Sequence, residues 1–210
     1  MTRFRHDGVP YFSQWSDPTF VNRIVVDGAD PCEDATWTTH GFPDQASYRF
    51  WAPRVCGLAC LESALAHWDV AVPTRWELVG AALAHGAYEV RGDGSVRGLT
   101  YAPFLRWTER RFGVTGRVHA DTTLDELVAA VSPDQFAVAS VSPEIRDPVG
   151  SPQLIGGHLV LVVGVDEHQV EFHNPSGVPP YQANARLPRD RFERYFAHRG
   201  FTMRRPPDHE

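Results

Sequence analysis

Residues 54–68, RVCGLACLESALAHW, contain the features that decide both the fold and the chemistry expected of this chain. The apolar residues of the stretch recur at the spacing i, i+3, i+4 and i+7 of a helix with one buried face: Leu61, Ala64, Leu65 and Trp68. Cys56, followed by a glycine, stands where this helix should begin, and Cys60 follows one turn later. The stretch therefore predicts an amphipathic helix with a thiol in its first turn.

Cys56 has three interpretations. It can be a buried small apolar residue, which is common for a free cysteine. It can share a metal or redox site with Cys60, but zinc sites use a second pair of ligands and the chain has only 3 cysteines, so we expect no metal and no cofactor. It can be a nucleophile, because the positive end of a helix dipole lowers the pKa of a thiol. In that case Gly57 would let a substrate backbone approach closely.

A nucleophilic cysteine needs a base, and His158 is the best candidate among the 10 histidines. It opens the most apolar β-run of the chain, HLVLVVGVD, directly after Gly156 and Gly157. Asn174 ends the next run, QVEFHN, and the tight turn between the runs should bring it towards His158. An amide oxygen that accepts from the imidazole would fix its tautomer and orientation. The alternatives are a purely structural strand histidine and an asparagine that serves the turn before Pro175.

Composition is that of an ordinary folded protein. The chain has 210 residues, 42% hydrophobic and 22% charged, which suits one sizeable core. A net charge of −6 gives no reason to expect nucleic acid or an anionic membrane as partner. No apolar run has the length of a bilayer span, and the first residues show no secretory signal. We expect a cytoplasmic protein with free thiols.

The order of the local signals predicts an α+β fold, since helical patterns come first and strand patterns second. Helices are predicted over 56–68, 73–86, 99–113 and 122–131, strands over 136–142, 158–166 and 169–174, and finally a helix over 189–196 and a strand over 200–204. Residues 15–53 have weak periodicity apart from a short predicted helix over 43–53. A segment of that length without clear elements predicts an insertion or a functional flap.

Four motifs in this order resemble the C39-like branch of the papain-fold cysteine peptidases. They are VPYFSQW (9–15), CGLACLESAL (56–65), GGHLVLVVGVD (156–166) and FHNPSG (172–177). The resemblance spans residues 9–201 and implies one papain-like domain over 1–210, with a helical part followed by an antiparallel sheet. Residues 15–53 would then be an insertion or flap before the catalytic helix.

The resemblance also implies roles for four residues. Cys56 would attack an acyl carbon, His158 would carry the shared proton to the leaving amine, and Asn174 would orient the imidazole. Gln14 would donate its amide to the oxyanion beside the backbone N–H of Cys56; its alternative is a surface glutamine. Two features depart from the family. Here 41 residues separate Gln14 from Cys56 where relatives have a short stretch, and Asn174 stands where many relatives carry Asp.

The implied function is a cysteine hydrolase that cleaves a peptide or amide substrate through a thioacyl intermediate. The same triad would serve an acyltransferase or amide-forming enzyme, in which an amine resolves the thioester. A non-catalytic papain-like binding module is the third alternative, and the complete set of Cys56, His158 and Asn174 argues against it. The sequence leaves the substrate and the oligomeric state open.

Overall fold

A seven-stranded antiparallel sheet carries most of the second half of the chain in the computed structural model, which describes residues 4–207. The strand order is β4-β9-β5-β6-β7-β8, and the short β1 also pairs with β6. The strands are β1 Phe4–Arg5, β4 Val118–Ala120, β5 Gln135–Val141, β6 His158–Val165, β7 Gln169–His173, β8 Ala185–Pro188 and β9 Phe196–Arg204. A separate hairpin pairs β2 Glu89–Val90 with β3 Val96–Arg97.

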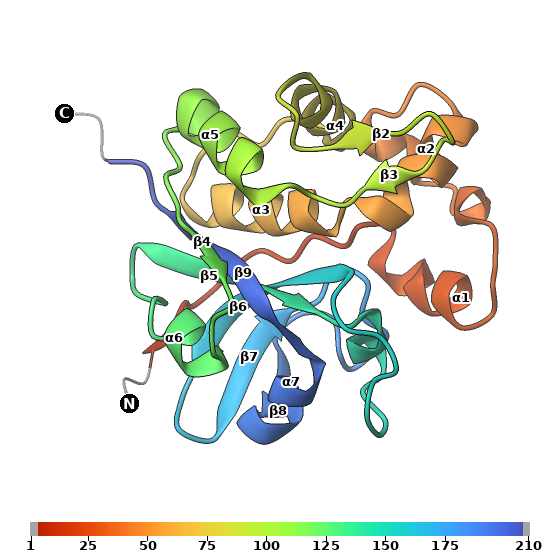
Figure 1. Cartoon of the computed structure of the whole chain (residues 1–210). Coiled ribbons are helices and arrows are strands. Elements are labelled where there is room, and N and C mark those ends of the chain that lie inside the picture. Colours follow the sequence, from red (N-terminus) through yellow and green to blue (C-terminus); the bar gives the residue numbers. More distant parts are fainter. Residues whose placement is uncertain (1–3, 208–210) are drawn as a thin grey trace.

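The helices lie mainly on one side of this sheet (Figure 1). They are α1 Val21–Val25, α2 Gln45–Trp51, α3 Cys56–His67, α4 Arg75–Ala84, α5 Tyr101–Phe112, α6 Leu124–Val128 and α7 Arg189–Tyr195. Short 3₁₀ helices occur at Pro18–Phe20, Pro31–Glu33, Trp37–His40, Ala52–Arg54 and Pro143–Arg146. In the described part of the chain, no helix is both long and apolar enough to cross a membrane. The predicted α+β class is confirmed.

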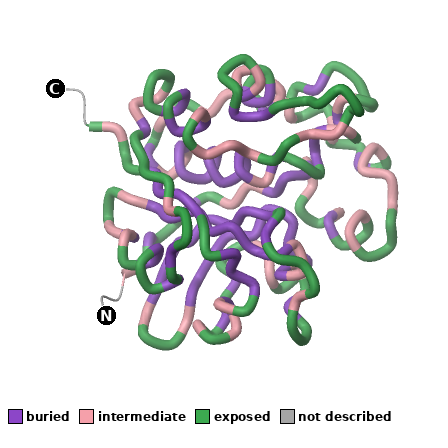
Figure 2. The backbone as a smooth tube through the Cα atoms, in the orientation of Figure 1, coloured by how far each residue is buried: buried purple, intermediate pink, exposed green. Residues whose placement is uncertain are grey.

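Strand β6 separates two cores, because all of its residues are buried and successive side chains point to opposite faces. Leu159, Leu161 and Val163 belong to the core under α3, whereas Val160 and Val162 belong to the core under α6 and α7. The purple segments in Figure 2 follow this central strand and the helix above it. Burial on both faces explains why the sequence of β6 is a continuous apolar run.

Local signals fixed most helix starts. Two helices begin with capping boxes that can be read from the sequence, Thr74 with Glu77 and Thr123 with Glu126, each satisfying two backbone N–H groups. The largest boundary differences are at two places. Helix α6 ends at Val128, three residues before the predicted end, and β9 starts at Phe196 rather than at Gly200 because it pairs with β5 along its length.

Residues 15–53 fold as short helices that pack on the main core. Trp15, Val21, Tyr48 and Trp51 are all buried in the core that α3 also enters. The predicted short helix before Cys56 is α2. That this segment is an insertion relative to other proteins of this fold stays a prediction.

An ion pair between Arg75 and Glu62 lies inside the helical layer. The Arg75 side chain is 0% exposed and that of Glu62 is 4% exposed. The Arg75 guanidinium also donates to two backbone carbonyls of the N-terminal segment, those of Ser13 (2.9 Å) and Gln14 (3.1 Å). One buried cation therefore joins α3, α4 and the segment that precedes α1.

Removing either charge should destabilise the protein strongly, because the other charge would stay buried without a partner. We expect Glu62→Gln and Arg75→Met each to lower the free energy of unfolding by about 3–5 kcal/mol, measured by urea denaturation. The double variant should lose less than the sum of the two. Glu109→Gln, at an exposed position of α5, is the control and should change stability by less than about 0.5 kcal/mol. Additive losses in the double variant would contradict the pairing.

Candidate active site

Cys56 is the first residue of α3, as the sequence predicts. No side chain caps this helix, so the N–H groups of its first turn are not taken up by a capping residue. Gly57 is needed here for packing. A Cβ atom at Gly57 would lie 2.6 Å from Leu99 and 2.9 Å from Leu159. A larger residue at Gly57 would therefore have to displace these two leucine side chains. That Gly57 lets a substrate backbone approach stays a prediction.

Cys56 and His158 open into the same cleft, which has a volume of about 640 Å³. Its walls come from the loop between the β2–β3 hairpin and α5, from the start of β6 and from β9. The other lining residues are Arg54, Tyr88, Val96, Arg97, Gly98, Leu99, Thr100, Tyr101, Ser140, Gly157, Leu159 and Arg199. None of them belongs to residues 15–53.

His158 is hydrogen-bonded to Asn174, as the predicted hairpin implies. Nε2 of His158 lies 2.8 Å from Oδ1 of Asn174, and both residues are buried. The amide orientation follows from its other contacts. Oδ1 accepts from the backbone N–H of Ser176 (3.2 Å), and Nδ2 donates to the carbonyl of Ile145 (3.3 Å). Oδ1 is thus an acceptor, so Nε2 of His158 carries the proton and Nδ1 keeps its lone pair.

Two further residues at this site were missed by the sequence analysis. The hydroxyl of Ser176 lies 3.1 Å from Nε2 of His158, and Nε of Arg146 donates to that hydroxyl at 2.7 Å. Ser176 belongs to the motif FHNPSG, but the sequence analysis assigns it no role. Arg146 lies in the 3₁₀ helix after β5, and no periodicity or motif in the sequence connects it to His158. Only the folded chain brings the Arg146 guanidinium close to the His158 imidazole.

The electrostatics of the site favour the neutral forms of both groups. Burial and the nearby charge of Arg146 lower the pKa of His158 to about 3, against the bond to Asn174. Burial also raises the pKa of the Cys56 thiol, although backbone hydrogen bonds and Arg146 oppose this. The backbone N–H groups of Cys56 and Gly57 at the helix start do lower the pKa of the thiol, as expected, but desolvation outweighs them and the net shift is upward.

Gln14 lies beside the loop that follows Asn174, and it is not among the residues that line the cleft. Its backbone N–H donates to the carbonyl of Pro175 (2.8 Å), the residue after Asn174. Gln14 is 1% exposed, so the surface alternative is excluded. Neither side-chain polar atom of Gln14 has a hydrogen-bond partner among the described residues. A buried amide is costly to leave unpaired.

Cysteine pairing and metal binding find no support in residues 4–207. Cys60 is buried on α3, with its sulfur 3.9 Å from the carbonyl of Leu159, and Cys32 is a free thiol in the N-terminal segment. The described residues contain no group of three or more His, Cys, Asp or Glu that could hold a metal ion.

Removing the Asn174 amide should impair the histidine more than the fold. Asn174→Ala leaves Nε2–H of His158 and the Ile145 carbonyl without this partner, at a cost of about 1–3 kcal/mol. We expect Cys56 alkylation by iodoacetamide at pH 6 to slow by roughly tenfold or more, because the imidazole loses its orientation. Gln182→Ala, a change on the following loop, is the control. Equal alkylation rates in both variants would contradict a positioning role for Asn174.

The comparisons with known proteins give a match in structure alone. No protein-family model matches the sequence, and no curated protein matches it. A Bacillus anthracis protein proposed to be a C39-like peptidase superposes with a TM-score of 0.58 at 13% identity, covering 99% of this chain and 100% of the other. The peptidase domain of Streptococcus ComA, described as a bifunctional ABC transporter of a quorum-sensing pathway, gives 0.49 at 15% identity, covering 73% and 93%. The chain therefore has the fold of a C39-like peptidase.

Proposed function

We propose that this chain is a cysteine hydrolase that cleaves a peptide or amide bond through a thioester on Cys56. The observation that carries the proposal is the 2.8 Å contact between His158 Nε2 and Asn174 Oδ1, at the wall of the cleft that also contains Cys56. Nδ1 of His158 is the ring nitrogen left free to take a proton. The fold is that of a C39-like peptidase, which supports the same assignment.

The chemistry begins with a proton transfer. His158 takes the thiol proton at Nδ1 as the Cys56 sulfur attacks the acyl carbon, so the new C–S bond forms without a separate base. The tetrahedral intermediate then collapses, the C–N bond breaks, and His158 returns the proton to the leaving amine. Water, deprotonated by His158, hydrolyses the thioester and restores the thiol.

The oxyanion needs donors that are in place before the reaction. The backbone N–H of Cys56, at an uncapped helix start, is one such donor. We propose the side-chain amide of Gln14 as the other. Its unpaired state among the described residues and the bond from its backbone to Pro175 support this role. Loss of one such donor costs about 10²–10³ in kcat in acyl-transfer enzymes.

The neutral resting forms of half-buried Cys56 and buried His158 suit an enzyme that reacts selectively. A neutral thiol and a neutral imidazole attack slowly until a substrate occupies the cleft. Together with three free cysteines, this is consistent with action in the cytoplasm, where we propose that the enzyme works. An acyltransferase would use the same residues and differ only in the acceptor of the thioester.

The proposal is tested with a fluorogenic peptide library of fully randomised sequence and with mass spectrometry of the intact protein. We expect turnover and a covalent acyl adduct on Cys56, both lost by a factor of roughly 10³ or more in Cys56→Ala. Cys32→Ala, at a thiol outside the cleft, should retain both. Hydroxylamine should release the adduct as a hydroxamate.

Three outcomes of this experiment are informative. Turnover that survives Cys56→Ala, or a Cys56 that stays unacylated across the library, contradicts the proposal. Acyl transfer to added amines that is strongly preferred over water would replace hydrolysis with the transferase alternative.

A further inference from the structure

The cleft beside Cys56 is cationic although the chain is acidic. Three of its lining residues are arginines, Arg54, Arg97 and Arg199, and none of the lining residues is Asp or Glu. The whole chain nevertheless has a net charge of −6. A cleft of one charge sign raises the local concentration of ligands of the opposite sign.

Arg54 and Arg199 make no ion pair in the described part of the chain, and of these two only Arg54 is held by a neighbouring side chain and carbonyl, those of Phe50. The Arg54 guanidinium stacks on the Phe50 ring at 4.4 Å and donates to the Phe50 carbonyl. Arg97 faces Glu89 at 3.9 Å. Arg199, in contrast, makes no ion pair with any acidic residue in the described part of the chain, residues 4–207.

A backbone irregularity directs Arg199 to the cleft. Val141 pairs with Phe196 and Ala139 pairs with Gly200, so three residues of β9 stand opposite the single residue Ser140. The middle one, His198, has a φ of 52°, which is unusual for a residue other than glycine. Bulges of this kind redirect side chains and occur next to active sites.

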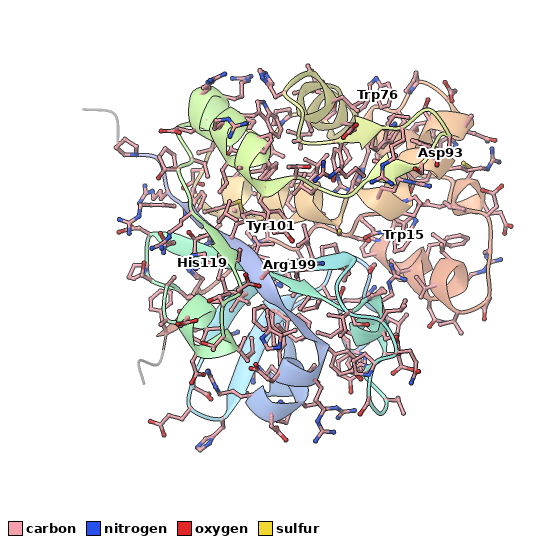
Figure 3. The ribbon with its side chains drawn as sticks, viewed as in Figure 1. Trp15, Trp76, Asp93, Tyr101, His119 and Arg199 are labelled. Atoms are coloured by element: carbon pink, nitrogen blue, oxygen red, sulfur yellow. The ribbon has the colours of Figure 1, made fainter. Side chains whose placement is uncertain are left out.

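The Arg199 guanidinium also lies against Gly156, in the loop that leads to His158. Gly156 lies two residues before His158 and has a φ of 76°, and a Cβ atom there would collide with Nη2 of Arg199. On its other side Arg199 approaches Tyr101, as Figure 3 shows at the boundary between the helices and the sheet. Burial raises the pKa of the Tyr101 hydroxyl, and hydrogen bonding to Ser140 and Arg199 opposes this, so the hydroxyl stays protonated as a donor.

We infer that Arg199 and the Tyr101 hydroxyl form a carboxylate subsite, so that the substrate is a peptide that carries a carboxylate near the cleaved bond. The carboxylate belongs to an Asp or Glu side chain near the cleaved bond or to the C-terminus of the peptide. A guanidinium binds a carboxylate through two parallel hydrogen bonds, and a phenol adds a third donor. This inference rests on the proposed function, because it assigns the substrate class of the same cleft.

The first test uses two alkylating reagents of similar size. Iodoacetate carries a carboxylate and iodoacetamide does not, so the ratio of their rates at Cys56 reports attraction of an anion to the cleft. We expect Arg199→Gln to lower this ratio by about fivefold or more, and high salt to lower it in the wild-type protein. Arg204→Gln, at the far end of the same strand, removes the same charge outside the cleft and should leave the ratio unchanged. Equal ratios in wild type and Arg199→Gln would overturn the subsite.

The second test uses paired peptides that differ only by Glu or Gln at each position near the bond, each with a free or an amidated C-terminus. We expect kcat/KM for the acidic member to exceed that of its neutral partner by about tenfold, and this preference to disappear in Arg199→Gln. The position or terminus that shows the preference identifies the source of the carboxylate. If no pair shows a preference, the subsite is wrong.

Different results would contradict the carboxylate subsite and the proposed hydrolase function. If iodoacetamide alkylates Cys56 in a His158-dependent manner and neutral peptides are cleaved as well as acidic ones, only the subsite fails. If Cys56 shows neither His158-dependent reactivity nor acylation, the proposed function fails with it.

Discussion

The buried guanidinium of Arg75 is the constraint on which the arrangement of the site depends. It pairs with Glu62, which lies on the same helix as Cys56, and it donates to the carbonyls of Ser13 and Gln14. Gln14 in turn donates its N–H to Pro175, next to the residue that orients His158. A buried charge needs ion-pair and hydrogen-bond partners within the protein, because water does not reach it. This one fixes the N-terminal segment between the helical layer and the end of β7.

The pKa shifts of Cys56 and His158 are also caused mainly by burial. A helix start lowers the pKa of a thiol and burial raises it, and here desolvation is the largest influence on the pKa of both Cys56 and His158. The charge of Arg146, whose guanidinium donates to Ser176, lowers the pKa of both groups, so it favours the thiolate of Cys56 and disfavours the imidazolium of His158. That the two groups share one proton as a coupled pair stays a prediction.

Much of the fold was predictable because its signals are local. Capping boxes such as Thr74 with Glu77, the helix that begins at Cys56 and the hairpin from His158 to Asn174 each depend on neighbours in sequence. The single buried face expected for the helix of Cys56 is wrong, because residues 57–65 are buried on every side. The four motif residues were named from their order along the chain, and the structure brings His158 and Asn174 into direct contact. The roles assigned to the four stay predictions.

What the sequence could not provide comes from contacts between distant segments. Arginines are usually exposed, so nothing marked Arg75 as fully buried. Arg146 and Ser176 are 30 positions apart and meet only because two loops close over the same end of the sheet. The direction of Arg199 depends on a bulge whose register exists only once β5 and β9 have paired. The sign of the Cys56 pKa shift likewise depends on burial in the folded chain.

The most direct test of the account is the pH dependence of Cys56 alkylation by iodoacetamide in wild type and in His158→Ala. A pair that shares one proton, with the pKa of His158 lowered to about 3 and that of Cys56 raised, should give a rate nearly independent of pH between 5 and 8. In His158→Ala the rate should instead rise about tenfold per pH unit, as for an isolated thiol. Profiles that rise identically in the two proteins would contradict the pairing of Cys56 with His158 and the catalytic role built on it.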